Sequence, residues 1–323
     1  MHRKDLHWSS ELTSFLVVKG TFIVVLPMLF ERQRVLITLL NALGGEVSLT
    51  DFQKLLFLYT RQEQTPSYEF VPYKFGCFSF TSYADKRRLT EKGLLVPDEY
   101  HWKLTPEGKM VARARSVTPL VAGKFYRETA ALRGNSLVEN VYQKYPYYAT
   151  RSEILQKILP NEADRDRVNQ SRPPKVGPSL MTIGYERKCL ETYLNQLLRA
   201  GVTLLCDVRR NPLSRKYGFS KNTLRNACER LDIHYEHLPQ LGIASEERRE
   251  LKTQADYDSL FEEYEATSLP QQTKALAQIK TWIKEGERVA LTCFELHHHQ
   301  CHRHCVAEAL ERSSRTNLIA RHL

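Results

Sequence analysis

The sequence predicts an α/β protein whose C-terminal half forms a mostly parallel sheet with helices on both faces. Three observations lead to this prediction. The chain has 323 residues, which is enough for about two domains of ordinary size. Apolar residues make up 42% and charged residues 26%, a balance typical of a folded globular protein and not of a disordered or coiled-coil chain. From residue 180 onward, short apolar segments alternate with amphipathic helical segments, the pattern of repeated β-α units.

Residues 1–33 are expected to be an extension that precedes the first domain. Residues 15–30 are apolar, but they are too few for a membrane span, and a lysine, a glycine and a proline interrupt them. No small-residue cleavage site follows, so a signal peptide is not favoured. We expect either a packed N-terminal element or an extension upstream of a natural start at Met28, and no membrane partner.

The cysteines and the charge indicate the compartment and the partner. The seven cysteines are odd in number and scattered, which favours reduced thiols in a cytoplasmic protein over a secreted disulfide framework. The formal net charge is +10, and 14 basic side chains stand against 7 acidic ones between residues 101 and 180. A surplus of this kind favours a polyanionic partner, and we expect that partner to be DNA.

Residues 34–110 are predicted to form three helices and a hairpin. The spacing of apolar residues predicts a first helix that ends at Gly44-Gly45 and a second helix capped by Ser48 or Thr50. A third helix is expected to begin near residue 80 and to end before Gly93, and residues 94–104 read as a short hairpin. This order resembles a winged helix-turn-helix module, in which the third helix enters the major groove.

Three consecutive cations on the third predicted helix, Lys86, Arg87 and Arg88, are the expected DNA contacts. The alternative is that they form a solvated face of a protein-contact module. Residues 54–59 and 70–76 also resemble phage-associated and antitoxin-type regulatory modules, which implies a bacterial setting.

Residues 111–179 are predicted to be a basic connector and linker, because three prolines and a glycine lie between residues 169 and 178. Residues 180–323 then form the predicted catalytic domain. The expected strands are residues 180–184, 202–208, 233–238, 289–294 and 317–319, and the expected helices are residues 190–200, 220–231, 271–284 and 302–313. Ligands of such sheets bind beyond the carboxyl ends of the strands, so the residues that follow each strand are the candidate site.

The first two strand ends supply small, charged and aromatic residues. Gly184, followed by Tyr185, permits a close backbone approach at the first exit. Strand alternation places Asp207 and Arg209 on one face of the second strand end. The loop that follows combines Arg215 with Tyr217 and Phe219, and cations with rings suit the phosphates and bases of extruded nucleotides. The alternative is a structural Asp–Arg pair beside a solvated loop.

The last strand end contains the most informative cluster. Cys293 and Glu295 share a face as the strand ends, and Cys301-His302-Arg303 opens the next predicted helix. The N-terminus of a helix favours an anion and lowers the pKa of a thiol placed there.

Zinc is a competing interpretation of the same segment. Cys293, His297–His299, Cys301, His302, His304 and Cys305 offer more ligands than one site needs. They lack the paired C-x-x-C spacing of common zinc sites, and Glu295 with Arg303 suits an anion. We therefore predict no metal and no cofactor. A nucleophilic Cys301 is favoured less than the anion site and less than the zinc site.

The segments TIGYE, CDVRRNPLSR, YEHLPQLG, LTCFE and CHR occur in this order from Met181 to Leu323 and resemble the bacterial family catalogued as domain of unknown function 488. The resemblance implies a Rossmann-like domain that acts on nucleotides or nucleic acid. Where that family commonly has Gly-His-Ser after the first strand, this chain has Gly184-Tyr185-Glu186.

We therefore expect a DNA-acting enzyme, a base-processing hydrolase of the N-glycosylase type in repair or phage defence. Such chemistry needs a carboxylate and cations that hold phosphate. The alternatives are a metal-dependent nuclease and a non-catalytic DNA-binding regulator that senses a nucleotide. The expected catalytic residues are Glu295 and Asp207, and the expected substrate contacts are Gly184, Tyr185, Arg209, Arg215, Tyr217, Phe219, Cys301, His302 and Arg303.

Overall fold

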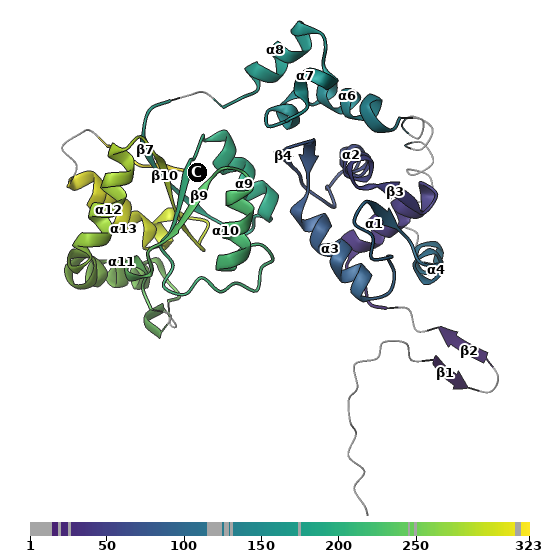
Figure 1. Ribbon diagram of the computed structural model, residues 1–323. Coiled ribbons are helices and arrows are strands. Elements are labelled where there is room, and N and C mark those ends of the chain that lie inside the picture. Colours follow the sequence, from purple (N-terminus) through teal and green to yellow (C-terminus); the bar gives the residue numbers. More distant parts are fainter. Residues whose placement is uncertain are drawn as a thin grey trace, which may run out of the picture. The chain divides into compact units, whose positions relative to one another are not determined.

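The computed structural model describes residues 15–18, 21–24, 27–114, 125, 129, 132–173, 176–244, 246–248, 251–313 and 318–323. The chain forms two compact units (Figure 1). Unit 1 is drawn from Met1–Tyr68 and Ser82–Val138, and unit 2 from Glu69–Thr81 and Glu139–Leu323.

The N-terminal segment contains two short strands, β1 (Phe15–Val18) and β2 (Thr21–Val24), which pair antiparallel. Across the described ranges, no helix combines the length and the apolar character that crossing a bilayer requires.

Unit 1 contains the helices that the spacing of apolar residues predicts, together with short strands. These elements are α1 (Glu31–Ala42), β3 (Glu46–Ser48), α2 (Leu49–Thr60), most of α3 (Phe80–Glu91), β6 (His101–Lys103) and α4 (Pro106–Ala114). Ser48 caps α2, because its Oγ accepts a hydrogen bond from the Asp51 amide at 3.2 Å. β3 and β6 pair antiparallel, and Leu95 bridges Leu104, which gives the predicted hairpin.

A buried carboxylate joins the elements of unit 1. Asp85 of α3 is fully buried and accepts hydrogen bonds from Arg32 Nε at 2.6 Å, Gln33 Nε2 at 2.8 Å and Tyr68 Oη at 3.1 Å. A buried charge is tolerated when a cation and several donors satisfy it, so this group fixes α1 against α3.

Unit 2 is built on a five-stranded sheet in which every pair of neighbours is parallel, as predicted. Its strands are β7 (Ser179–Gly184), β8 (Leu204–Asp207), β9 (His234–His237), β10 (Arg288–Cys293) and β11 (Arg321–His322). The last strand lies beyond the expected residues 317–319. Its two residues are exposed at the sheet edge and therefore carry no apolar pattern.

The strand order in this sheet is β11-β7-β10-β8-β9. β10 therefore lies between β7 and β8, an arrangement that differs from the 3-2-1-4-5 order of dinucleotide-binding domains. The apolar residues of α9 (Leu190–Arg199) and α10 (Lys221–Glu229) form one core on one face of the sheet. Those of α11 (Gln254–Glu263), α12 (Thr273–Lys284) and α13 (Arg303–Arg312) form a second core on the other face (Figure 1). The helices that follow β7 and β8 thus cover one face of the sheet, and the helix that follows β10 covers the other. Parallel sheets bind their ligands at such a switch point.

Unit 2 also includes segments that the sequence placed elsewhere. The hairpin of β4 (Val71–Tyr73) and β5 (Gly76–Phe78) belongs to it, although we expected these residues within 34–110. Within the expected connector 111–179 lie α6 (Gly134–Lys144), whose second half belongs to unit 2, α7 (Leu155–Ile158) and α8 (Glu162–Gln170). α7 and α8 are short and mostly polar and have no clear apolar period. α6 buries Leu137, Val138, Val141 and Tyr142 at helical spacing, a period that our assignment of this segment to a linker overlooked.

Specific bonds hold the β4–β5 segment within unit 2. Glu191 of α9 is buried and accepts hydrogen bonds from the Thr81 amide at 2.7 Å and the Thr81 hydroxyl at 2.9 Å. Asn195 Nδ2 donates to the Phe70 carbonyl at 2.7 Å. Val71 and Phe80 belong to the same buried cluster as the apolar face of α9.

Candidate active site at the carboxyl edge of the sheet

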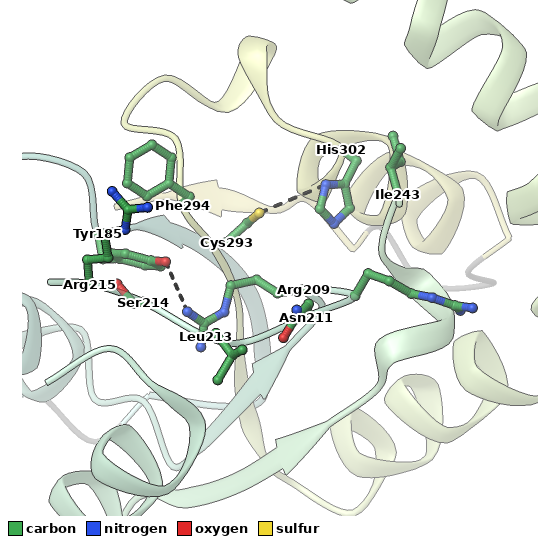
Figure 2. Close-up of a pocket in the computed structure, with 11 residues that line it drawn as sticks. Tyr185, Arg209, Asn211, Leu213, Ser214, Arg215, Ile243, Cys293, Phe294 and His302 are labelled. Carbon is green, nitrogen blue, oxygen red and sulfur yellow. Dashed lines mark hydrogen bonds between the residues drawn. The ribbon is translucent and has the colours of Figure 1, made fainter. Parts of the chain in front are cut away.

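A cavity of about 330 Å³ lies in unit 2 where β7, β10 and β8 end (Figure 2). This is the edge where a parallel sheet is expected to bind its ligand. Of the described residues that line it, none is acidic. The lining residues are Tyr185, Arg209, Arg210, Asn211, Leu213, Ser214, Arg215, Ile243, Cys293, Phe294 and His302.

Aromatic residues form one end of the cavity. Tyr185 stacks on Phe219 with centroids 4.3 Å apart, and the ring of Phe294 meets Tyr185 edge-on at 5.3 Å. Phe294 is 42% exposed, so its ring is accessible to a ligand, and it lies beside Tyr185 and Arg215 in Figure 2. Phe294 could not be selected from the sequence, because a single aromatic residue after a strand is common.

Two aromatic residues expected to stack on substrate have structural roles instead. Phe219 is fully buried in the core between the sheet and α9. Tyr217 packs against the same core and donates its hydroxyl to the Phe80 carbonyl at 3.2 Å. A base cannot reach a buried ring, so the prediction for Phe219 is corrected.

Asp207 and Arg209 form a buried ion pair at the end of β8. Asp207 is fully buried, and its carboxylate accepts bonds from Arg209 Nε at 2.8 Å, Arg209 Nη2 at 2.5 Å and Tyr235 Oη at 2.5 Å. The alternation of the strand therefore brings the two side chains together as expected. With its oxygens occupied by these donors, Asp207 is placed to position Arg209 and does not face the cavity as a second catalytic acid.

Arg209 is held by the protein through all three of its guanidinium nitrogens. Its Nη1 donates to Tyr185 Oη at 3.0 Å and to the Phe219 carbonyl at 2.8 Å, while Nε and Nη2 serve Asp207. Arg209 is 5% exposed, and its guanidinium joins β8 to the loop after β7. The cations available to an anion in this cavity are instead Arg215 and Arg210, which are exposed and line it.

Glu295 lies directly after β10 and is half-buried. The Cys293 thiol donates to Glu295 Oε2 at 3.3 Å, which confirms that the two side chains share a face. Arg303 is buried and donates to the carbonyl oxygens of Glu295 at 2.7 Å and Leu296 at 3.1 Å. Arg303 therefore holds the loop that carries Glu295, and it is not placed to bind a phosphate.

Gly184 permits this loop to pass over the end of β7. A Cβ built on Gly184 would lie 1.8 Å from the Glu295 carbonyl oxygen and 3.2 Å from Arg303 Nη1. The close approach that the sequence predicts at this position is thus made by the protein's own backbone rather than by substrate. Any side chain here would displace the backbone of Glu295.

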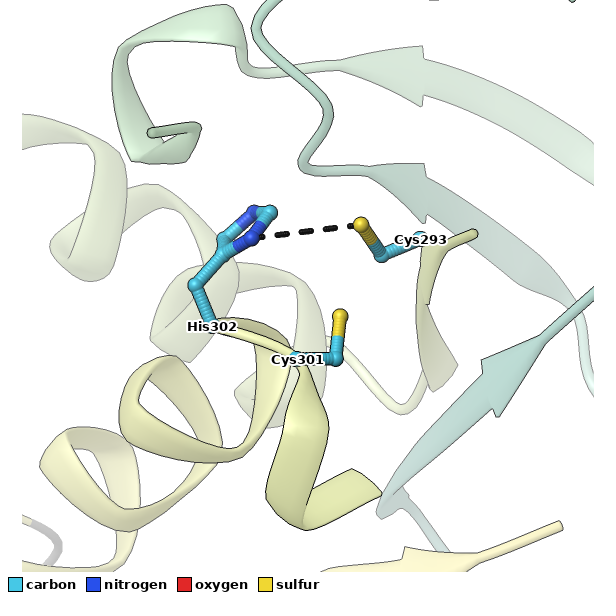
Figure 3. Close-up of side chains that lie close together, drawn as sticks. All are labelled: Cys293, Cys301 and His302. Carbon is cyan, nitrogen blue, oxygen red and sulfur yellow. Dashed lines mark hydrogen bonds between the residues drawn. The ribbon is translucent and has the colours of Figure 1, made fainter. Parts of the chain in front are cut away.

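Cys293, Cys301 and His302 converge at the wall of the cavity (Figure 3). Their ligating atoms all lie within 4.8 Å of one another, and all three residues are buried. Burial, together with a smaller effect of the neighbouring Cys293, raises the pKa of Cys301 to about 12. The lowered thiol pKa expected from a helix start is therefore wrong, because burial dominates and α13 begins only at Arg303.

The three consecutive histidines lie apart from this group. Residues His298–Gln300 form a 3-10 turn, and His298 stacks on His322 of β11 with ring centroids 3.8 Å apart. Burial lowers the pKa of His298, and His322 adds to this shift.

In unit 1, the three expected DNA contacts differ in their surroundings. Lys86 Nζ donates to the Asp98 carbonyl at 2.8 Å and lies 5.4 Å from the Trp102 ring, and burial lowers its pKa. Arg88 Nη1 lies 3.8 Å from Asp85 Oδ1. Arg87 is exposed. Successive helical residues point about 100° apart, so these side chains cannot form a single DNA-facing row.

The family model described as domain of unknown function DUF488 matches residues 189–310. This match supports the predicted resemblance for the C-terminal domain. It includes every residue that lines the cavity except Tyr185. That description assigns no activity. No curated protein matches the chain.

Proposed function

We propose that unit 2 is a hydrolase that acts on one nucleotide unit of DNA by releasing the base from its sugar. The observation that carries this proposal is the composition of the cavity, which is lined by two exposed arginines and one accessible aromatic ring, with the carboxylate of Glu295 bonded to the lining residue Cys293. A volume of about 330 Å³ is at the small end of ligand sites, which suits one extruded nucleotide rather than a dinucleotide.

Each part of this site has a task in hydrolysis of an N-glycosidic bond. Arg210 and Arg215 would hold the phosphate of the extruded nucleotide, and Phe294 would stack on the base. Glu295 would take a proton from the attacking water as the water oxygen bonds to the sugar carbon and the base departs with the bonding electron pair. Asp207 and Arg209 act as positioning residues, because they fix the loops after β7 and β8.

We also propose that residues 27–68 and 82–114, which belong to unit 1, bind duplex DNA as a winged helix-turn-helix. The order of α1, β3, α2 and α3, followed by the pairing of Leu95 with Leu104 and of β3 with β6, supports this assignment. In such modules the third helix contacts the major groove and the hairpin contacts phosphate.

A substrate screen tests the proposed reaction. The full chain is incubated with duplex and single-stranded oligonucleotides that carry normal or modified bases, and the products are scored separately as free base, abasic site or broken strand. We expect free base and an abasic site, with activity lost in Glu295→Gln and retained in Glu236→Gln, which removes an exposed carboxylate from β9.

The other two candidate functions give different products in the same screen. A nuclease leaves strand breaks without free base, and a regulator changes DNA affinity without any product. Either result in a protein that binds the DNA would refute the proposed hydrolase.

A further inference from the structure

We propose that Cys293, Cys301 and His302 bind one zinc ion at the wall of the cavity. This inference goes beyond the proposed function, because it concerns metal binding and does not depend on which substrate is hydrolysed. It also replaces our expectation from the sequence, where the spacing of the cysteines argued against a metal.

The distances suit a tetrahedral site. With bonds of about 2.3 Å to sulfur and about 2.0–2.1 Å to nitrogen, neighbouring donors in such a site lie roughly 3.6–3.8 Å apart. Cys293 Sγ and His302 Nδ1 are 3.9 Å apart, and all three donor atoms lie within 4.8 Å of one another. Small side-chain rotations would therefore complete the coordination.

The histidine is held in the orientation that a metal ligand needs. His302 Nε2 lies 3.1 Å from the Val208 carbonyl oxygen, which can only accept a hydrogen bond, so Nε2 carries the proton. Nδ1 is then the free acceptor, and it points toward the two thiols (Figure 3). In zinc sites, a ligating histidine usually donates its other N–H to a backbone carbonyl or a carboxylate, which fixes the orientation of the ring.

The burial of the cluster also favours a metal over a free thiol nucleophile. Cys293, Cys301 and His302 are each at most 2% exposed. A nucleophilic thiol needs an accessible position, which these buried cysteines lack. Zinc would displace the thiol protons and give two thiolates whose charge the ion compensates.

The site would keep its fourth position for chemistry. Cys293 and His302 both line the cavity, so an ion bound to them borders the space that we assign to substrate (Figure 2). A zinc ion with three protein ligands typically binds a water molecule and lowers its pKa to about 7. Glu295 Oε2 lies 3.3 Å from Cys293 Sγ, one of the proposed ligands. Two cysteines, one histidine and a nearby glutamate also activate water in zinc-dependent base deaminases, so the set is competent for hydrolysis.

Metal analysis of the intact chain tests the inference. The protein is produced in zinc-supplemented medium, purified under reducing conditions, and analysed for zinc by mass spectrometry. We expect about one zinc ion per chain in the wild type and in Cys228→Ser, which alters a buried cysteine of the core on the α9 side. In Cys293→Ser and Cys301→Ser the zinc affinity should fall by more than about 100-fold. Replacing a residue that only orients a ligand already lowers metal affinity by about 10–100-fold.

Cobalt substitution tests the coordination in the wild-type protein, so this measurement does not depend on the folding of a variant. The wild-type protein with Co²⁺ should show thiolate-to-metal charge transfer and the intense visible bands of tetrahedral coordination. Any of three results would overturn the inference. They are a zinc content no higher in the wild type than in Cys293→Ser, a cobalt spectrum without thiolate bands, and a Cys293–Cys301 disulfide in the reduced preparation. Zinc binding without hydrolysis would refute only the proposed function, and hydrolysis by a protein that binds no zinc would refute only this inference.

Discussion

Asp207 and Arg209 show what single residues reveal before a structure is known. Strand alternation correctly predicts that the two side chains share a face, because that depends only on the period of the backbone. Whether the pair faces substrate or the protein depends on Tyr185, Phe219 and Tyr235, which lie on other elements. Local sequence contains no information on those contacts, so the catalytic assignment of Asp207 could not be tested from it.

Replacing Asp207 by asparagine should therefore reduce stability. The change leaves Arg209 buried without its charge partner, and breaking a buried pair costs about 3–5 kcal/mol. Urea unfolding measures the free energy of unfolding. Asp232→Asn is the matched control, because Asp232 pairs with Arg151 on the surface, where such a pair contributes at most about 1 kcal/mol. Equal stability of the two variants would show that Asp207 is not a structural anchor.

Gly184 gives a second prediction at this scale. In Gly184→Ala the new methyl group would overlap the Glu295 carbonyl, so the loop must shift. Overpacking of this kind costs about 1–3 kcal/mol, and the shift should also reduce turnover. Gly177→Ala, with no atom within 4 Å of the new carbon, should match the wild type in thermal unfolding. Wild-type stability and turnover in Gly184→Ala would contradict the contact.

At the scale of elements, helical and strand periodicity located the parts that have a clear apolar face. The helices α1, α2, α9, α12 and α13 and the central strands were predicted for this reason. β11, α7 and α8 bury too few residues to show a period, and they are stabilised by contacts within unit 2.

The third helix of unit 1 gives a prediction about DNA binding. Arg87→Ala should weaken binding at all sequences and reduce the slope of log K against log[salt] by about one, as expected for one lost phosphate contact. Lys86→Ala should instead lower the stability of unit 1, because Lys86 packs on Trp102 and binds the Asp98 carbonyl. Fluorescence anisotropy across a salt series measures the slope. An unchanged slope in Arg87→Ala would show that Arg87 of this helix does not contact DNA phosphate.

At the scale of the molecule, the parallel sheet was predictable and its strand order was not. The order follows from crossovers between distant segments, and β-α repetition is equally compatible with several orders. The same limit applies to the site. Strand ends were correctly expected to meet at one edge, but the partners of Arg209, Arg303 and Gly184 came from loops across that edge.

The boundary predicted at residue 180 leads to a test of unit 2. A fragment of residues 180–323 would lack the β4–β5 hairpin, expose the cluster that contains Val71, and leave Glu191 without Thr81. Exposing apolar surface that is buried in the full chain is costly, so the fragment should unfold at lower urea than unit 2 within the full chain. Coincident unfolding transitions for the fragment and for unit 2 would show that this segment does not stabilise the sheet.

The central claim is that Glu295 performs the chemistry in the cavity at the carboxyl edge of the sheet. Its most direct test is single-turnover base release by Glu295→Gln, measured together with DNA affinity and thermal unfolding. Glutamine keeps the shape of the side chain and removes the proton acceptor, so the rate should fall by about 10²–10⁴ while affinity and stability remain near those of the wild type. A folded Glu295→Gln protein that releases base at the wild-type rate would contradict the claim.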